Sequence, residues 1–168
     1  MPKVQRFFLE LKKSQKPKKS FIIPINIKIS LETKKNININ KFFYRQVGKN
    51  HFWRDRLLWS DNEWKKYINN MNLETGIMKI KENMVGFYEQ EFHEDKNEME
   101  LIQMGILKEY QGKKLGSYLL KHIIQNAFNR DVKRLWVHTC SLDHKYALNN
   151  YLSKGLKIFK EEEIDFIL

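Results

Sequence analysis

The chain has 168 residues, of which 42% are hydrophobic and 13% aromatic, and a formal net charge of +11 at pH 7. This composition supplies a core, argues against a disordered chain, and fits a single domain over residues 1–168. No apolar run reaches the ~20 residues that cross a bilayer. The charged N-terminus is unlike a signal peptide, and the single cysteine, Cys140, allows no internal disulfide, so we expect a cytoplasmic protein.

The excess of basic residues has three interpretations. In order of preference they are a lysine-rich background composition, attraction to a polyanionic ligand, and binding to nucleic acid. Nucleic acid comes last because the basic residues do not alternate with aromatic ones in any recognised motif.

The first part of the chain predicts two strands and a helix. Residues 4–12 are an apolar strand, and residues 21–32 alternate apolar and polar side chains, with Pro24 favouring an edge position. The two strands could pair as a hairpin within residues 1–32. Residues 36–47 have helical spacing, and Gly48 is expected to cap that helix.

An aromatic and charged loop at 50–56 precedes a second predicted helix. Ser60 and Glu63 have the spacing of a capping box at its start. Strands are then expected at three places, which are residues 77–81, 85–92 and 98–106.

The second half alternates strands and helices. An amphipathic helix at 115–128 is followed by a strand at 132–140 and a helix at 142–154, with Asp143 as its N-cap. Residues 156–168 would close the sheet. This order predicts an α/β fold with a mixed sheet covered by helices on both faces.

The loop before the 115–128 helix is suited to phosphate. Residues 111–116 read QGKKLG, and the helix start offers free backbone N–H groups and a partial positive charge. The loop has neither the Lys-Ser/Thr pair of a P-loop nor the G-x-G-x-x-G dinucleotide pattern. Taken alone, a plain strand–turn–helix with solvated lysines is the alternative interpretation.

This loop resembles the acetyl-CoA loop of the GNAT N-acetyltransferase superfamily, R/Q-x-x-G-x-G/A. Gln111 and Gly116 match the first and last positions, and Lys114 replaces the middle glycine.

A second motif follows about forty residues later. The superfamily pattern A-x-x-x-Y-x-x-x-G-F is matched by Ala147, Tyr151 and Gly155, with Leu156 in place of the phenylalanine. The chain is also similar to an uncharacterised bacterial branch of this superfamily. The matching stretches are residues 43–48, 53–56, 60–61, 86–89, 100–106 and 136–144.

The resemblance implies a central, mostly antiparallel sheet flanked by helices, and transfer of an acetyl group from acetyl-CoA to a primary amine by direct attack. It implies no metal ion and no membrane, a small-molecule or peptide acceptor, and a monomer or homodimer. The implied cofactor-binding residues are Met104, Gly105, Ile106, Gln111, Gly112, Lys113, Lys114, Leu115, Gly116 and Ser117.

Tyr151 is the implied acid for the coenzyme A sulfur, against the alternative of a packed aromatic. Glu89 or Glu100, on adjacent strands that could point both into one cleft, would serve as base directly or through water, unless they merely face solvent. His138 is a further candidate base, and a structural role is the commoner one for a strand histidine. Direct transfer makes Cys140 an improbable nucleophile.

The residues implied to recognise the acceptor are Tyr44, Trp53, Arg54 and Arg56, with an arginine for a substrate carboxylate. The alternative for each is a packed surface loop. Two other functions stay open, a basic module that binds nucleic acid or the ribosome, and a non-catalytic GNAT protein, which the lysine at 114 suggests.

Overall fold

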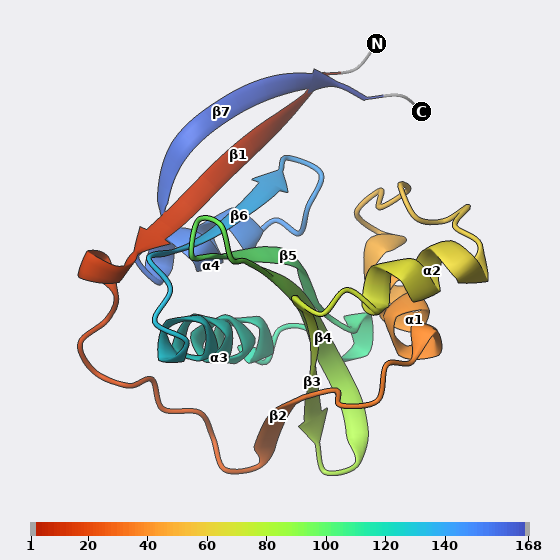
Figure 1. The fold of residues 1–168 in the computed structure, drawn as a ribbon, viewed down its shortest axis with the longest axis horizontal. Helices are drawn as coiled ribbons and strands as arrows, with labels where there is room; N and C mark the ends of the chain where they lie inside the picture. Colours follow the sequence, from red (N-terminus) through yellow and green to blue (C-terminus); the bar gives the residue numbers. More distant parts are fainter. Residues whose placement is uncertain (1–2, 167–168) are drawn as a thin grey trace.

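The computed structural model describes residues 3–166, which form one seven-stranded sheet with four α-helices around it (Figure 1). The strand order is β2-β3-β4-β5-β6-β1-β7. The strands are β1 (Lys3–Lys12), β2 (Ile27–Leu31), β3 (Leu73–Ile80), β4 (Asn83–His93), β5 (Glu98–Ile106), β6 (Arg134–Cys140) and β7 (Lys157–Asp165). The helices are α1 (Ile37–Gly48), α2 (Asp61–Ile68), α3 (Leu115–Asn129) and α4 (Ala147–Ser153), with short 3-10 turns at Lys13–Gln15 and Lys108–Tyr110.

Helices cover the two faces of the sheet unequally. The apolar stripe of α3, which includes Leu119 and Ile123, packs with Met99 of β5 in the main core. On the opposite face α1 forms a smaller core, where the Phe43 ring stacks on Phe87 of β4 with centroids 4.8 Å apart. Figure 1 shows α1 and α2 together at one end and α3 under the middle of the sheet. The predicted mixed sheet flanked by helices is therefore confirmed.

The predicted N-terminal hairpin is wrong, because four strands separate β1 from β2 in the sheet. β1 pairs antiparallel with both β6 and β7, whereas β2 pairs with β3 at the far edge. The reason is burial: Leu9 and Leu11 of β1 are fully buried, as suits an interior strand, while β2 buries chiefly Ile27. A strand with two buried positions gains more from having neighbours on both sides.

β5 and β6 run parallel and then separate. Their pairing covers only four residue pairs and ends at Leu101 and Val137. At the same level the β4–β5 pairing slips, because Gln90 faces Leu101 while Glu89 faces Gln103. The extra residue is Ile102, and such a bulge bends its strand. β5 therefore turns away from β6, and a fork opens between their ends.

Several predicted ends move by a few residues. The capping box is confirmed, since Glu63 N–H donates to Ser60 Oγ and Ser60 N–H to the Glu63 carboxylate. Gly48 lies inside α1 rather than capping it, and the last helix begins at Ala147. Of the predicted last strand, residues 167 and 168 lie outside the described part. Within residues 3–166, no helix combines the length and the apolar character that crossing a membrane requires.

Candidate active site

A large cleft of about 1210 Å³ occupies the fork between β5 and β6. Its walls come from the ends of these strands, the start of α3, helix α4, the loop after α1, and the ends of β1 and β7. The cleft thus lies where the sequence motifs converge.

The backbone of β5 faces this cleft at the predicted positions. Leu107 N–H donates to the Val85 carbonyl of β4. In an antiparallel ladder, hydrogen-bonded and non-hydrogen-bonded pairs alternate. The N–H and C=O groups of Met104 and Ile106, opposite Tyr88 and Gly86, therefore point away from β4 and toward the fork. An extended polar chain could pair with this free edge as a further strand would.

Gly105 is required between these two residues by a close contact. A Cβ atom at this position would lie 2.3 Å from Val47 Cγ1 of α1, far inside van der Waals contact. The absence of a side chain at Gly105 therefore allows α1 to pack closely against β5 beside the cleft.

Two residues of the loop before α3 have left-handed backbone conformations. Gly112 has φ +81° and Lys114, the N-cap of α3, has φ +61°. Lys114 thus adopts the left-handed conformation that the glycine of the motif would adopt easily, at a cost of ~1 kcal/mol. The first intrahelical bond runs from Tyr118 N–H to Lys114 O, so the N–H groups before it, at Leu115, Gly116 and Ser117, are available to a ligand.

The other two loop residues have different positions. The Gln111 side chain lines the cleft and donates from Nε2 to the Ile106 carbonyl at 3.2 Å, which ties the loop to β5. Lys113 is outside the cleft wall, with its ammonium 5.6 Å from the centre of the Tyr110 ring. The Lys113 side chain therefore lies outside the cleft wall, and the contribution of this residue to the binding loop stays a prediction.

Tyr151 of α4 lies in the cleft with only 7% of its surface exposed. Burial, with a smaller contribution from Asp143, raises the pKa of its phenol. Asn150 Nδ2 donates to the Gly116 carbonyl at 3.1 Å, which ties α4 to the start of α3. The phenol is thus positioned relative to the loop by the residue before it.

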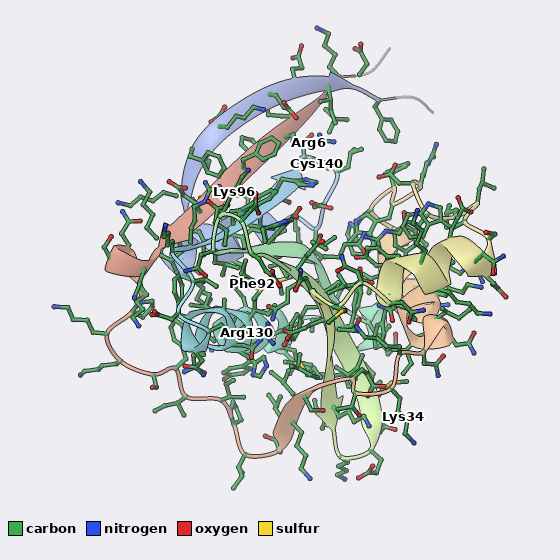
Figure 2. The ribbon with its side chains drawn as sticks, in the orientation of Figure 1. Arg6, Lys34, Phe92, Lys96, Arg130 and Cys140 are labelled. Carbon is green, nitrogen blue, oxygen red and sulfur yellow. The ribbon has the colours of Figure 1, made fainter. Side chains whose placement is uncertain are left out.

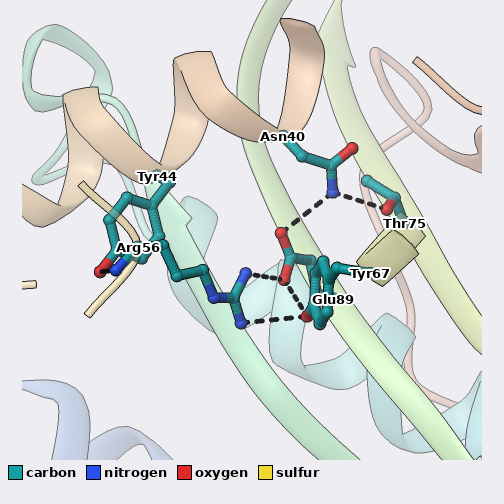
Figure 3. A network of polar contacts seen from close by, with 6 residues as sticks. All are labelled: Asn40, Tyr44, Arg56, Tyr67, Thr75 and Glu89. Atoms are coloured by element: carbon teal, nitrogen blue, oxygen red, sulfur yellow. Dashed lines mark hydrogen bonds and ion pairs between the residues drawn. The ribbon is translucent and has the colours of Figure 1, made fainter. Parts of the chain in front are cut away.

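The two glutamates predicted as bases do not line the cleft. Glu89 is fully buried, and its carboxylate accepts from Arg56 Nη1 at 2.9 Å, Asn40 Nδ2 at 3.0 Å and the Tyr67 hydroxyl at 2.5 Å (Figure 3). Glu100 is bonded instead to His93 Nε2 at 2.8 Å. The prediction that both would point into one cleft is wrong. The β4–β5 register places Glu89 opposite Gln103, and helices α1 and α2 cover its side of the sheet.

The predicted acceptor residues divide into two groups. Tyr44, Trp53 and Arg54 line the cleft. Arg56 does not line the cleft, because it is only 9% exposed and its guanidinium forms an ion pair with Glu89. Its expected role in binding a substrate carboxylate is therefore wrong. The Arg56 backbone N–H donates to the Tyr44 hydroxyl at 3.0 Å (Figure 3). The buried Arg56–Glu89 ion pair therefore supports the loop that carries Trp53 and Arg54.

Sequence reasoning missed two cleft residues. The Gln103 Oε1 atom is buried, and the described residues offer it no hydrogen-bond partner. Asp143 is not a helix cap; it accepts from Trp53 Nε1, from the Thr139 hydroxyl and from Cys140 N–H, and so joins the loop after α1 to the end of β6. Both lie in stretches that resemble the superfamily, but only the fork in the sheet brings them to the cleft.

One group of potential metal ligands lies on the same sheet face outside the cleft. The ligand atoms of Glu91, His93 and Glu100 lie within 4.8 Å of one another. Each already has a protein partner, since His93 binds Glu100 and Glu91 accepts from Asn70 at 2.7 Å. These hydrogen bonds account for the proximity of the three side chains on the sheet surface without a metal ion.

Residues 35–155 match the family model for the acetyltransferase (GNAT) family. The chain belongs to the GNAT acetyltransferase family. A search of curated protein sequences found no match. The family match covers the phosphate-type loop, both fork strands and Tyr151 of this GNAT protein.

Solved structures share the fold at low sequence identity. A GCN5-related N-acetyltransferase from Sphaerobacter thermophilus is 12% identical with a TM-score of 0.72, over 96% of this chain and 50% of that one. A functionally unknown conserved protein from Staphylococcus epidermidis ATCC 12228 is 17% identical with a TM-score of 0.61, over 96% of this chain. This GNAT protein spans 60% of the length of the Staphylococcus protein.

A third similar structure contains ligands. It is the spermidine N-acetyltransferase from Vibrio cholerae in complex with CoA and spermine. It is 16% identical, with a TM-score of 0.63, over 77% of this chain and 80% of that one. At these identities the likeness concerns the fold alone.

Proposed function

We propose that this GNAT protein transfers an acetyl group from acetyl-CoA to a primary amine of a small molecule or peptide. One observation carries the proposal. A single cleft brings together the free backbone edge of β5, the N-terminus of α3 and the buried Tyr151 phenol. These are a place for an amide-bearing chain, a place for a diphosphate and a proton donor near the strand fork.

The residues present fit acetyl-CoA. The N–H groups at the start of α3 and the charge of Lys114 suit the diphosphate, because a helix N-terminus attracts anions. The outward N–H and C=O of Met104 and the outward N–H of Ile106 suit the amides and carbonyl of the acylated arm, while the Ile106 carbonyl accepts from Gln111. Since Lys114 keeps the left-handed conformation, the departure from the motif leaves the loop geometry intact. The lysine at 114 is therefore compatible with cofactor binding.

The chemistry requires a proton donor for the leaving thiolate, and Tyr151 fills this role. A tyrosine hydroxyl is protonated at neutral pH and burial keeps it so, which makes Tyr151 a hydrogen-bond donor to the sulfur as charge develops there. Low exposure also strengthens a hydrogen bond to that charge.

The acceptor would enter from the side lined by Tyr44, Trp53 and Arg54, opposite the core that holds Tyr151. The V. cholerae relative is named for a polyamine and contains one, so polyamines belong in the acceptor panel. Amino acids, amino sugars and peptides complete it, because all present primary amines.

The test has two parts. Acetyl-CoA should raise the melting temperature of the protein, and thiol release should depend on at least one amine of the panel. The proposal would be contradicted if neither acetyl-CoA nor dephospho-CoA raised the melting temperature of the protein. Salt-sensitive retention of RNA without any response to coenzyme A would instead support a nucleic-acid-binding module.

A further inference from the structure

The first β6 residue beyond the fork is a histidine. Val137 makes the last pair with Leu101 of β5, and its side chain is buried in the core on the α3 side. Side chains alternate along a strand, so the next residue, His138, faces the other side. His138 lines the cleft there, on the side from which the acceptor would enter.

The His138 ring packs against one neighbouring strand, β1, and is otherwise exposed. It lies opposite Phe8 of β1, with ring centroids 5.6 Å apart and a tilt of 45°. Two pairs further along, Arg6 lies opposite Cys140, and Figure 2 shows these two residues close together near the upper end of the sheet. The imidazole is therefore packed on one side and open to the cleft on the other.

Three other candidate proton acceptors are poorly suited to the role. Asp143 has both carboxylate oxygens bonded, Oδ1 by Trp53 and Oδ2 by Thr139 and Cys140. Burial, followed by the charge of Asp143, raises the pKa of the Cys140 thiol, so little thiolate is present at neutral pH. The buried Glu89 carboxylate has three hydrogen bonds and no access to the cleft. Further titratable groups also line the cleft, none of them on the two fork strands: His51, Asp55, His144 and Asp165.

We propose that His138 is the group that takes the proton from the acceptor amine, an inference that rests on the N-acetyltransferase function proposed above. The amine lone pair forms the new C–N bond while the C–S bond breaks and its electron pair stays on sulfur. One amine proton moves to the His138 imidazole, and the thiolate takes the Tyr151 proton. Solvent then returns a proton from the imidazolium to the phenolate, so the sum is an amide and a thiol.

The environment of His138 favours the neutral imidazole, which is the form that can accept a proton. Partial burial and the Arg6 guanidinium of β1 lower the pKa of its imidazole, against smaller opposing effects of Glu100 on β5, Asp143 in the loop after β6 and Glu162 on β7. A lowered pKa means that the ring is neutral at pH 7 and becomes protonated only as the pH falls below ~6.5. Turnover should fall over that same range.

The experiment compares His138→Gln with His93→Gln, a histidine of the same sheet face that lies outside the cleft wall. The probe is the amine of the panel that gives the fastest thiol release. His138→Gln should lower kcat by ~10²-fold or more, leave the acetyl-CoA thermal shift unchanged and remove the acidic limb below pH 6.5. His93→Gln should keep the wild-type rate and profile. Added imidazole should restore part of the rate of His138→Ala, which a purely structural role would not allow.

The two levels of the proposal fail differently. If the wild-type protein releases no thiol with any amine and acetyl-CoA gives no thermal shift, the N-acetyltransferase function fails and the role of His138 with it. If the wild type turns over and His138→Gln retains its kcat and its acidic limb, the assignment of His138 alone is overturned.

Discussion

Removing the Glu89 carboxylate should unfold this protein more readily rather than disable its chemistry directly. Glu89 and Arg56 form a buried ion pair at 2.9 Å, with exposed side-chain fractions of 0% and 9%. Taking away one member of such a pair leaves an uncompensated buried charge and costs ~3–5 kcal/mol. In a chain of this size ~1 kcal/mol corresponds to a shift of ~2–4 °C in melting temperature. Glu89→Ala should therefore lower the melting temperature by ~6–20 °C.

The matched control lies two residues along the same strand. Glu91 accepts one hydrogen bond, from Asn70, at the surface, so Glu91→Ala should cost less than ~1 kcal/mol. Both variants are followed by thermal denaturation and by thiol release at a temperature where each is folded. The double variant Arg56→Met/Glu89→Met should recover part of the loss, because no isolated charge remains buried.

The reasoning would be refuted by one result in particular. If Glu89→Ala melted within ~2 °C of the wild type yet lost turnover, Glu89 would be acting on the substrate, as the sequence first indicated. A large loss of stability with turnover retained below the melting point would support the structural role.

Three further predictions concern the cleft. Lys114→Gly should stabilise the protein by up to ~1 kcal/mol, because glycine adopts the left-handed conformation without strain, and Lys114→Ala should give no such gain. Both variants should bind acetyl-CoA several-fold more weakly in a titration, because a cation is lost. Tyr151→Phe should lower kcat by ~10²-fold or more with little change in the KM for acetyl-CoA, and an unchanged kcat would remove Tyr151 as the acid. Gly105→Ala should cost ~1–3 kcal/mol in denaturant unfolding, because its Cβ would lie 2.3 Å from Val47 Cγ1. Adding Val47→Ala should restore much of that loss, and a Gly105→Ala protein as stable as the wild type would contradict the close-contact argument.

Local patterns in the sequence were reliable where a few neighbouring residues decide the structure. The capping box at Ser60 and Glu63 and the amphipathic stripe of α3 depend on spacings of three and four residues, and both were confirmed. The left-handed turn at Lys114 is different. A lysine there gave no sign of this conformation, which the motif only suggested through the glycine it replaces.

Long-range pairing was not accessible in this way. Alternation along residues 21–32 indicated a strand but could not show that its partner is β3 rather than β1. The buried Glu89 illustrates the same limit for function. A glutamate among apolar neighbours can face a cleft or an internal arginine, and Arg56 lies 33 residues away in sequence.

Taken by itself, the sequence determined the α/β character of this protein and its family motifs at 111–116 and 147–155, because those properties follow from short-range spacing and from matched motifs. Only the tertiary structure decided which residues share the cleft. The bulge at Ile102 separates β5 from β6, and that separation exposes a backbone edge and His138 while Glu89 and Arg56 are enclosed behind α1 and α2. The opening of a fork depends on how two strands distant in sequence pair, which is a property of the assembled sheet.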